Sequence, residues 1–230
     1  MRNKVPVAAI LFFVFQFCGT FLYADETEIK AGGYIRNFFI LNELKQDTAF
    51  EAVSHLRLRL NIIPSESSFF EIAYELFPRF RDKDISSIPL PGPALLSYRV
   101  FDLDEEIYPD DKDSGDDFML MQNLDRLLLT MSTSSMDISA GRQPIAFGSA
   151  HVINPTDIIA PFTYDTIAKE ELVGVDSVRV KTPLPEMGEL DMGVVFGDDF
   201  KSEKSAAFIR MNTYQLQTDI SFMAMAFREN

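Results

Sequence analysis

His55-Leu56-Arg57-Leu58-Arg59-Leu60-Asn61-Ile62 is the stretch that decides the fold. Every even-numbered residue in it is apolar and every odd-numbered one is polar. Side chains of a β-strand point alternately to the two faces of its sheet. The stretch therefore predicts a strand with one apolar face and one polar face.

The same two-residue period recurs through most of the chain, with turn residues between the periodic stretches. No stretch among them has a convincing helical period, so the fold class predicted is all-β. We expect nine strands, at 30–42, 52–63, 68–77, 119–131, 136–143, 173–182, 189–197, 204–211 and 213–227.

The expected connections alternate in length: 64–67, 132–135, 183–188 and 212 are short, whereas 43–51, 78–118, 144–172 and 198–203 are longer. Outer-membrane barrels have short periplasmic turns and longer surface loops. Their strands close on one another because hydrocarbon offers the backbone no hydrogen-bond partner. The alternation therefore predicts an antiparallel transmembrane β-barrel.

A soluble antiparallel sandwich is the alternative, because its strands would also alternate. It gives no reason for every second connection to be short. Connections of 41 and 29 residues, at 78–118 and 144–172, would also be unusual in a small sandwich.

The amino terminus predicts export. Arg2 and Lys4 precede a hydrophobic stretch of thirteen residues, Val5 to Phe17, apolar except for Gln16, which is shorter than the roughly 17 to 25 residues that a spanning helix needs. We expect a signal peptide at 1–24, a barrel domain at 25–230 and a location in the outer membrane. Cleavage would also remove Cys18, the sole cysteine, and with it any disulfide or thiolate site.

Charge and side-chain inventory restrict the partners and the chemistry. The formal net charge of −14 and pI near 4.5 disfavour nucleic acid. The two histidines, His55 and His151, are too few for a multi-histidine metal site, and no nucleophile elbow surrounds Ser149. We therefore expect no enzyme and no cofactor. The expected partners are outer-membrane lipid, lipopolysaccharide and small hydrophilic solutes, and a homo-oligomer stays open.

Two motifs lie after the middle of the chain. Gly141-Arg142-Gln143-Pro144-Ile145-Ala146-Phe147-Gly148 is followed by Asn154-Pro155-Thr156-Asp157. Together they resemble a stretch of porin-like outer-membrane barrels of Gram-negative bacteria, and Asn123–Arg126 and Gly174–Arg179 are similar to the segments flanking it. The resemblance covers residues 119–182 and implies a channel. Members of this family are usually longer, which predicts that the chain is the amino-terminal part of a larger, incomplete barrel.

The polar faces of the expected strands would line the lumen. They carry six basic and five acidic residues. Arginine rings in a pore favour anionic solutes, whereas arginines paired with carboxylates across neighbouring strands would merely fill and stiffen the lumen. The candidates for pore lining are Arg57, Arg59, Glu71, Glu75, Arg126, Arg142, Arg179, Lys181 and Arg210.

Arg142 departs from the pattern, because strict alternation from Met136 would aim it at lipid. Either it lies near the membrane interface, or a bulge at Gly141 turns it inward. The long connection 144–172 is expected to fold inward and narrow the channel, or else to be a solvated surface loop. Its candidate constriction residues are His151, Asn154 and Asp157.

The run 101–117 contains nine acidic residues and one lysine. A solvated acidic loop is the simplest interpretation. Weak binding of calcium or magnesium by the clustered carboxylates is the alternative, although the EF-hand spacing fails.

These observations together predict passive diffusion of small hydrophilic solutes through a water-filled lumen. Two other functions stay open. An export barrel for an acidic polysaccharide would need a far more basic lumen, and a structural or adhesive surface barrel would have a plugged lumen.

Overall fold

The computed structural model describes residues 27–44, 47–81, 98–103, 106–108, 117–147, 159–160, 172–185, 187–215 and 217–227. The expected signal peptide, 1–24, and His151, Asn154 and Asp157 lie outside these residues. The described elements are β1 (Glu28–Leu44), β2 (Asp47–Ser65), β3 (Ser68–Arg81), β4 (Glu106–Tyr108), β5 (Phe118–Ser132), β6 (Asp137–Pro144), β7 (Gly174–Leu184), β8 (Gly188–Val195), η1 (Asp198–Phe200), η2 (Ser202–Lys204), β9 (Ala206–Gln215) and β10 (Thr218–Phe227).

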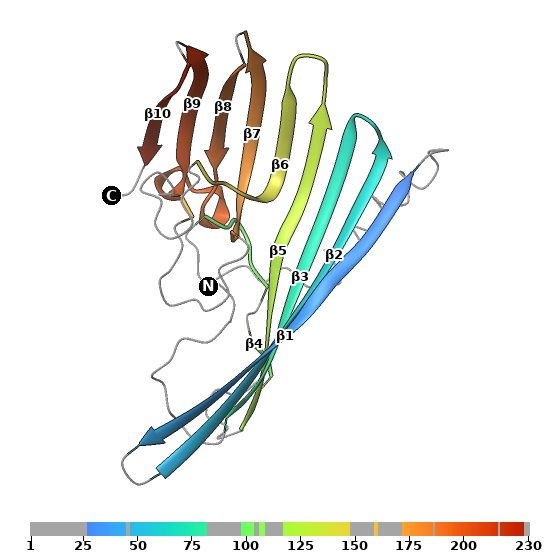
Figure 1. The fold of residues 1–230 in the computed structure, drawn as a ribbon, viewed down its shortest axis with the longest axis vertical. Coiled ribbons are helices and arrows are strands. Elements are labelled where there is room, and N and C mark those ends of the chain that lie inside the picture. Colours follow the sequence, from blue (N-terminus) through green and yellow to red (C-terminus); the bar gives the residue numbers. More distant parts are fainter. Residues whose placement is uncertain are drawn as a thin grey trace.

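The strands form one antiparallel sheet in the order β1-β2-β3-β5-β6-β7-β8-β9-β10, and β4 pairs with β5 (Figure 1). The predicted all-β, antiparallel fold class is confirmed. Within the described residues, β1 and β10 are the two edges of the sheet and do not pair with each other. The sheet is therefore not closed by hydrogen bonds, as expected of an incomplete barrel.

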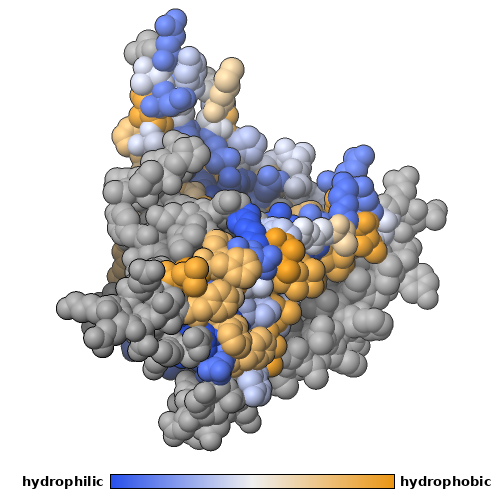
Figure 2. Space-filling model, turned by 60° about the horizontal axis from the view of Figure 1, so that its bottom comes forward, coloured by the Kyte–Doolittle hydropathy of each residue, from blue (hydrophilic) through white to orange (hydrophobic). Residues whose placement is uncertain are grey.

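One face of the sheet, here called the outer face, is apolar across all its strands. Its cross-strand rows include Ala140, Val178, Val194 and Ala207, which lie opposite one another in turn. Many large side chains on this face are exposed, such as Leu58 at 52% and Phe39 at 71%, whereas Ile62 and Phe70 are buried. On the face shown in Figure 2, hydrophobic residues gather into a patch bordered by hydrophilic ones.

The opposite face, here called the inner face, carries the polar residues and is the buried one. Arg57 is 2% exposed and Asp191 is 1% exposed. The usual relation of a soluble sheet, with its apolar face buried and its polar face wet, is thus inverted.

The nine predicted strands correspond to β1, β2, β3 and β5 to β10, and three local predictions are wrong. The connection 43–51 is mostly strand, because β1 and β2 stay paired out to Leu44 and Asp47. The turn expected at 212 lies after Gln215, since Asn212 still pairs with Ser221. The strand β4 was missed because its three residues lie in an acidic run without alternation.

The length of a connection depends on the end of the sheet at which it lies. At the end drawn uppermost in Figure 1, every connection is short: 66–67, 133–136, 185–187 and 216–217. At the other end, 82–117, 145–173 and 196–205 are longer, but 45–46 is only two residues. The predicted alternation therefore holds for every connection except the first.

The sheet splits between β5 and β6, at what we call the fork. Pairing of these strands ends at Leu127 and Arg142, whereas β5 stays paired with β3 as far as Phe118. Below the fork in Figure 1, β6 bends away and β5 continues. Gly141 has φ of +114° next to the fork, a backbone conformation that favours glycine.

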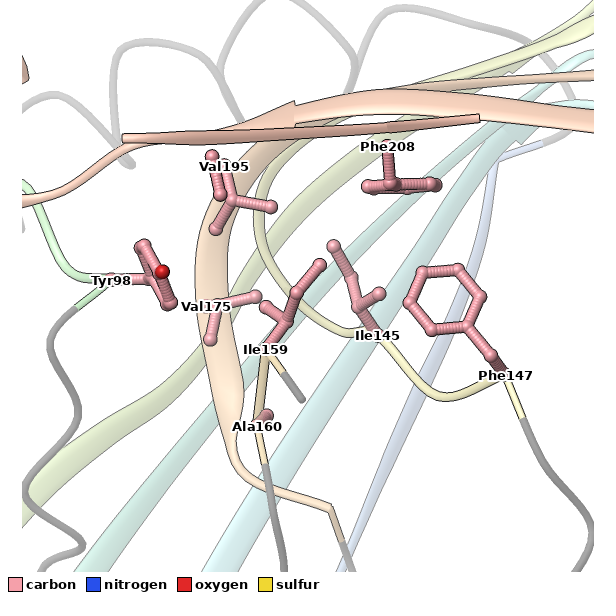
Figure 3. Packing of buried hydrophobic residues seen from close by; sticks show 9 residues of the cluster. Tyr98, Ile145, Phe147, Ile159, Ala160, Val175, Val195 and Phe208 are labelled. Carbon is pink, nitrogen blue, oxygen red and sulfur yellow. The ribbon is translucent and has the colours of Figure 1, made fainter. Parts of the chain in front are cut away.

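An apolar cluster covers part of the inner face under β7, β8 and β9. Val175, Val195 and Phe208 point from the sheet toward Ile145 and Phe147, which follow β6 (Figure 3). The cluster also takes in Tyr98, Ile159, Ala160 and Ala206. The described parts of the connection 144–172 thus pack against the inner face.

No helix within the described ranges is long and apolar enough to cross a membrane.

Gly141→Ala should destabilise the fold, whereas Gly32→Ala should not. A Cβ at Gly141 would lie 2.1 Å from the Leu127 carbonyl oxygen, in addition to the unfavourable φ, while a Cβ at Gly32 meets nothing within 4 Å. We expect a loss of about 1 to 3 kcal/mol or more at Gly141 and little change at Gly32. Urea unfolding of both variants under identical conditions measures this, and equal stability would contradict the assignment of the fork.

Candidate functional site

A network of buried charges lies at the fork, on β2, β3, β5, β6 and β7 and on the short segment 98–103, which we call the strap. In Figure 1 the strap runs from the lower ends of β7 and β8 toward β5. The members of this fork network are His55, Arg57, Glu75, Arg99, Asp102, Asn123, Asp125, Arg126, Arg142 and Asp176.

Arg57 is the centre of the part on β2, β3 and β5. Its Nη1 donates to Glu75 Oε1 at 2.6 Å and lies 2.7 Å from Asp125 Oδ2. Glu75 also lies 3.0 Å from His55 Nε2 and accepts from Asn123 Nδ2 at 2.7 Å. Arg57 and Glu75 are direct cross-strand partners, so the strand register alone brings this ion pair together.

The strap joins this part of the network to β7. Arg99 Nη1 donates to Asp102 Oδ2 at 2.9 Å and to Asn123 Oδ1 at 2.8 Å. The Val100 amide donates to Asp176 Oδ2 at 2.8 Å, and the Asp176 amide donates to the Tyr98 carbonyl at 3.0 Å. The strap is therefore held by both side-chain and backbone bonds.

Arg142 connects the strap, β5 and β7. Its Nε donates to Asp176 Oδ1 at 2.8 Å, and its Nη1 donates to Asp102 Oδ1 at 3.2 Å and to the Leu124 carbonyl at 2.8 Å. Its Nη2 donates to the Phe101 carbonyl. The Leu124 carbonyl lies in the part of β5 that β6 no longer reaches, so Arg142 supplies a donor where a strand partner is missing.

Arg126 and Asp125 also bond to backbone groups, on the other side of the fork. Asp125 occupies a bulge, since Ala73 pairs with Arg126 and Tyr74 pairs with Leu124. The bulge directs the Asp125 carboxylate to Arg126 Nη1 at 2.6 Å and to the Gly174 amide at 3.0 Å. The backbone at the start of β7 is thereby tied to β5.

The charges of the fork network balance. Four arginines face four carboxylates, and each of the eight side chains is buried or nearly so. Burying unpaired charge is costly, and the cost is offset only when each ion has close partners. Balance and burial together favour the prediction of cross-strand pairing over that of free arginines attracting anions.

The structure brings four of the nine predicted pore-lining residues into the network: Arg57, Glu75, Arg126 and Arg142. The other five lie on the inner face nearer the short connections. Arg59 lies 3.1 Å from Glu71, Lys181 lies 3.6 Å from Glu189, and Arg210 donates to Ser221 at 3.2 Å. Arg179 forms a two-point pair with Asp191, at 2.8 and 2.5 Å.

Arg142 is buried at 1% exposure. By register it takes a position in line with outer-face residues, opposite Leu127 and Asp176. Gly141, the residue before Arg142, has a positive φ, and the Arg142 side chain inserts among the strap residues. Arg142 is buried, as in the inward placement, but Gly141 stays in register with Leu128 and Ser177, so no bulge at Gly141 turns it.

The acidic run 101–117 is not uniformly solvated. Asp102 is part of the fork network, and Glu106–Tyr108 forms β4. Most of the other acidic residues lie outside the described residues. No group of three or more potential metal ligands occurs within the described ranges, and divalent cation binding by the rest of the run stays a prediction.

Sequence reasoning missed Arg99, Asp102, Asp125 and Asp176 as members of a site. Asp125 and Arg126 are adjacent charges within a strand, and both can reach the polar face only if a bulge lies there. Arg99 carried no such signal, because it stands in a long connection without periodicity.

Comparison of the chain with protein-family models, with curated proteins and with solved structures gives no match. The interpretation of the site therefore depends on its own geometry.

Arg142→Met should cost far more stability than Lys181→Met. The first removes the partner of two buried carboxylates, and breaking a buried pair costs about 3 to 5 kcal/mol. The second breaks a half-exposed pair at 3.6 Å, worth at most about 1 kcal/mol. Urea unfolding of the two variants under identical conditions makes the comparison, and a similar loss in both would show that the fork network contributes little.

Proposed function

We propose that the chain forms the wall of a porin-like channel in the bacterial outer membrane, for passive diffusion of small hydrophilic solutes. The observation that carries the proposal is the inverted sheet, with its apolar face exposed and its polar face buried. Exposed apolar surface of this extent is costly in water and favourable against lipid.

The charge distribution on the two faces supports a lipid environment. Among outer-face positions with described side chains, the charged residues are Arg142 and Asp176, which pair with each other at the fork. Of the other charged strand residues whose side chains are described, most alternate onto the inner face. Charges on a lipid-facing strand cost up to about 2 to 4 kcal/mol at the midplane, so this segregation suits a membrane wall.

Strand length supports the same environment. The shortest strands of the continuous sheet, β6 and β8, have eight residues each. At a rise of 3.2–3.4 Å per residue they extend about 26 Å, slightly less than the length of the roughly 9 to 11 residues that a tilted spanning strand needs. The longer β1, β2 and β3, with 17, 19 and 14 residues, have length to spare for tilt.

Aromatic residues gather on the outer face of the longer strands. Phe50 lies between Phe39 and Phe80, with ring centroids 6.4 Å from each, and Tyr108 lies 6.0 Å from Phe118. Phe39 is 71% exposed. Aromatic rings are enriched where a barrel meets the membrane interface, so this group suits a girdle in contact with lipid or lipopolysaccharide.

The balanced inner face bears on which solutes would pass. Arg57, Arg59 and Arg179 on this face are paired with carboxylates, which leaves little excess positive charge there to concentrate anions. This supports a channel with weak charge preference and argues against export of an acidic polysaccharide.

A plugged surface barrel is the second candidate, favoured by one observation. The apolar cluster around Ile145, Phe147 and Phe208 covers part of the inner face. In a wide water-filled lumen, the polar groups of that face would contact water instead. A permanent plug would make the protein structural or adhesive.

Val178→Arg separates a lipid-facing wall from a soluble sheet. Val178 is 41% exposed at the middle of β7 on the outer face, and Met187 is 91% exposed in the turn after β7. We expect Val178→Arg to lose about 2 to 4 kcal/mol in vesicles and Met187→Arg to change little. Urea unfolding is the measurement, and an equally small effect of both, as for ordinary surface sites, would contradict the membrane assignment.

Conductance in planar bilayers tests the channel itself. Purified protein from outer membranes should give discrete current steps with weak preference between cations and anions. Stably inserted protein that stays silent under all conditions would favour the plugged barrel.

A further inference from the structure

The strap is bound to the wall in a way that allows it to leave. Its own two charges pair with each other, because Arg99 Nη1 lies 2.9 Å from Asp102 Oδ2. On the wall, Arg142 pairs with Asp176 at 2.8 Å and Arg57 pairs with Glu75 at 2.6 Å. Neither part would be left with an unbalanced charge after separation, so the large cost of an orphaned buried ion is avoided.

Several bonds join the strap to the wall. An ion pair joins Asp102 to Arg142, at 3.2 Å. The Phe101 carbonyl accepts from Arg142 Nη2, the Tyr98 carbonyl from the Asp176 amide and the Val100 carbonyl from the Asp199 amide. The Arg99 side chain reaches Asn123 and the Gly174 carbonyl, and the Val100 amide reaches Asp176. Tyr98 packs in the apolar cluster under β7 to β9 (Figure 3). The strap therefore lies over the inner face at the fork without being a strand of the sheet.

We propose that the strap is a gate of the channel and that the Asp102–Arg142 ion pair is its clasp. The proposal rests on the proposed channel function. With the clasp closed, the strap and the apolar cluster cover the inner face at the fork. With the clasp open, the strap moves off the wall as a neutral unit, and the Arg142–Asp176 and Arg57–Glu75 pairs stay in place as the lining.

The structure offers a reporter for strap release. Leu103 is 8% exposed and uncharged, and Cys18 is the sole cysteine of the chain. In a Cys18→Ser background, Leu103→Cys provides a single thiol that a maleimide reaches slowly while the strap is bound. Labelling is followed in intact outer membranes, and conductance of the same proteins is recorded in planar bilayers.

Asp102→Asn removes the charge of the clasp and keeps the shape of the side chain. It also removes the carboxylate beside Arg99, so a second variant that changes no charge is measured alongside it. Because bonds to charged groups are among the stronger ones, we expect labelling of the thiol introduced by Leu103→Cys to be about tenfold faster or more, and the channel to be open for a larger fraction of the time. The matched control is Asp117→Asn, which removes an exposed carboxylate from the same long connection and should leave both readouts unchanged.

Val100→Pro is the second variant, used in parallel in case Asp102→Asn does not insert. It removes the amide that donates to Asp176 at 2.8 Å and changes no charge. It should also accelerate labelling and increase the open fraction.

The outcomes separate the two proposals. Labelling rates in Asp102→Asn and Val100→Pro equal to that of the control would overturn the gate, even if the protein conducts. Faster labelling with no current in any variant would overturn the channel and with it the gating role. Faster labelling together with a larger open fraction supports both.

Discussion

Burial of the polar face is the constraint on which the rest of the structure depends. A sheet that exposes its apolar side must accommodate every charged side chain on the inner side, where water is scarce. Isolated ions are too costly there, so each must find a partner in the next strand or in a covering segment. Arg57 with Glu75 and Arg179 with Asp191 are the direct result. The strand register therefore fixes the electrostatics of the inner face as well as the pairing of the backbone.

The fork shows how the same constraint applies to the backbone. Where β6 departs, the carbonyls and amides of β5 lose a strand partner, and buried backbone groups must be satisfied. Arg142 donates to the Leu124 carbonyl and the Asp125 carboxylate accepts from the Gly174 amide. Arginine suits this place because its planar fork of donors bonds a carbonyl and carboxylates at once. The glycine before Arg142 makes the necessary backbone conformation inexpensive.

Strand existence, face assignment and cross-strand pairing follow from the two-residue period, so the sequence predicts most of the sheet. What it could not predict lies where that period fails. Arg142 breaks the alternation, and two placements fit it until the φ of Gly141 is known. Asp102 and Arg99 stand in a connection without periodicity, and no local rule places a distant loop against β6 and β7. The short connection of two residues between β1 and β2 was not predicted, because the polar residues at 43–51 are typical of a loop.

The neutral strap also bears on the choice between a channel and a plug. In a permanent plug, the charges of the plug and those of the wall would not need to balance separately. All the ion pairs could then join the plug to the wall. Here Arg99 pairs within the strap and Arg142 pairs within the wall, while Asp102 links the two sides. Such a division lowers the electrostatic cost of separation, because no buried ion loses all its partners. A contact of this kind is more useful to a protein that opens than to one that stays filled.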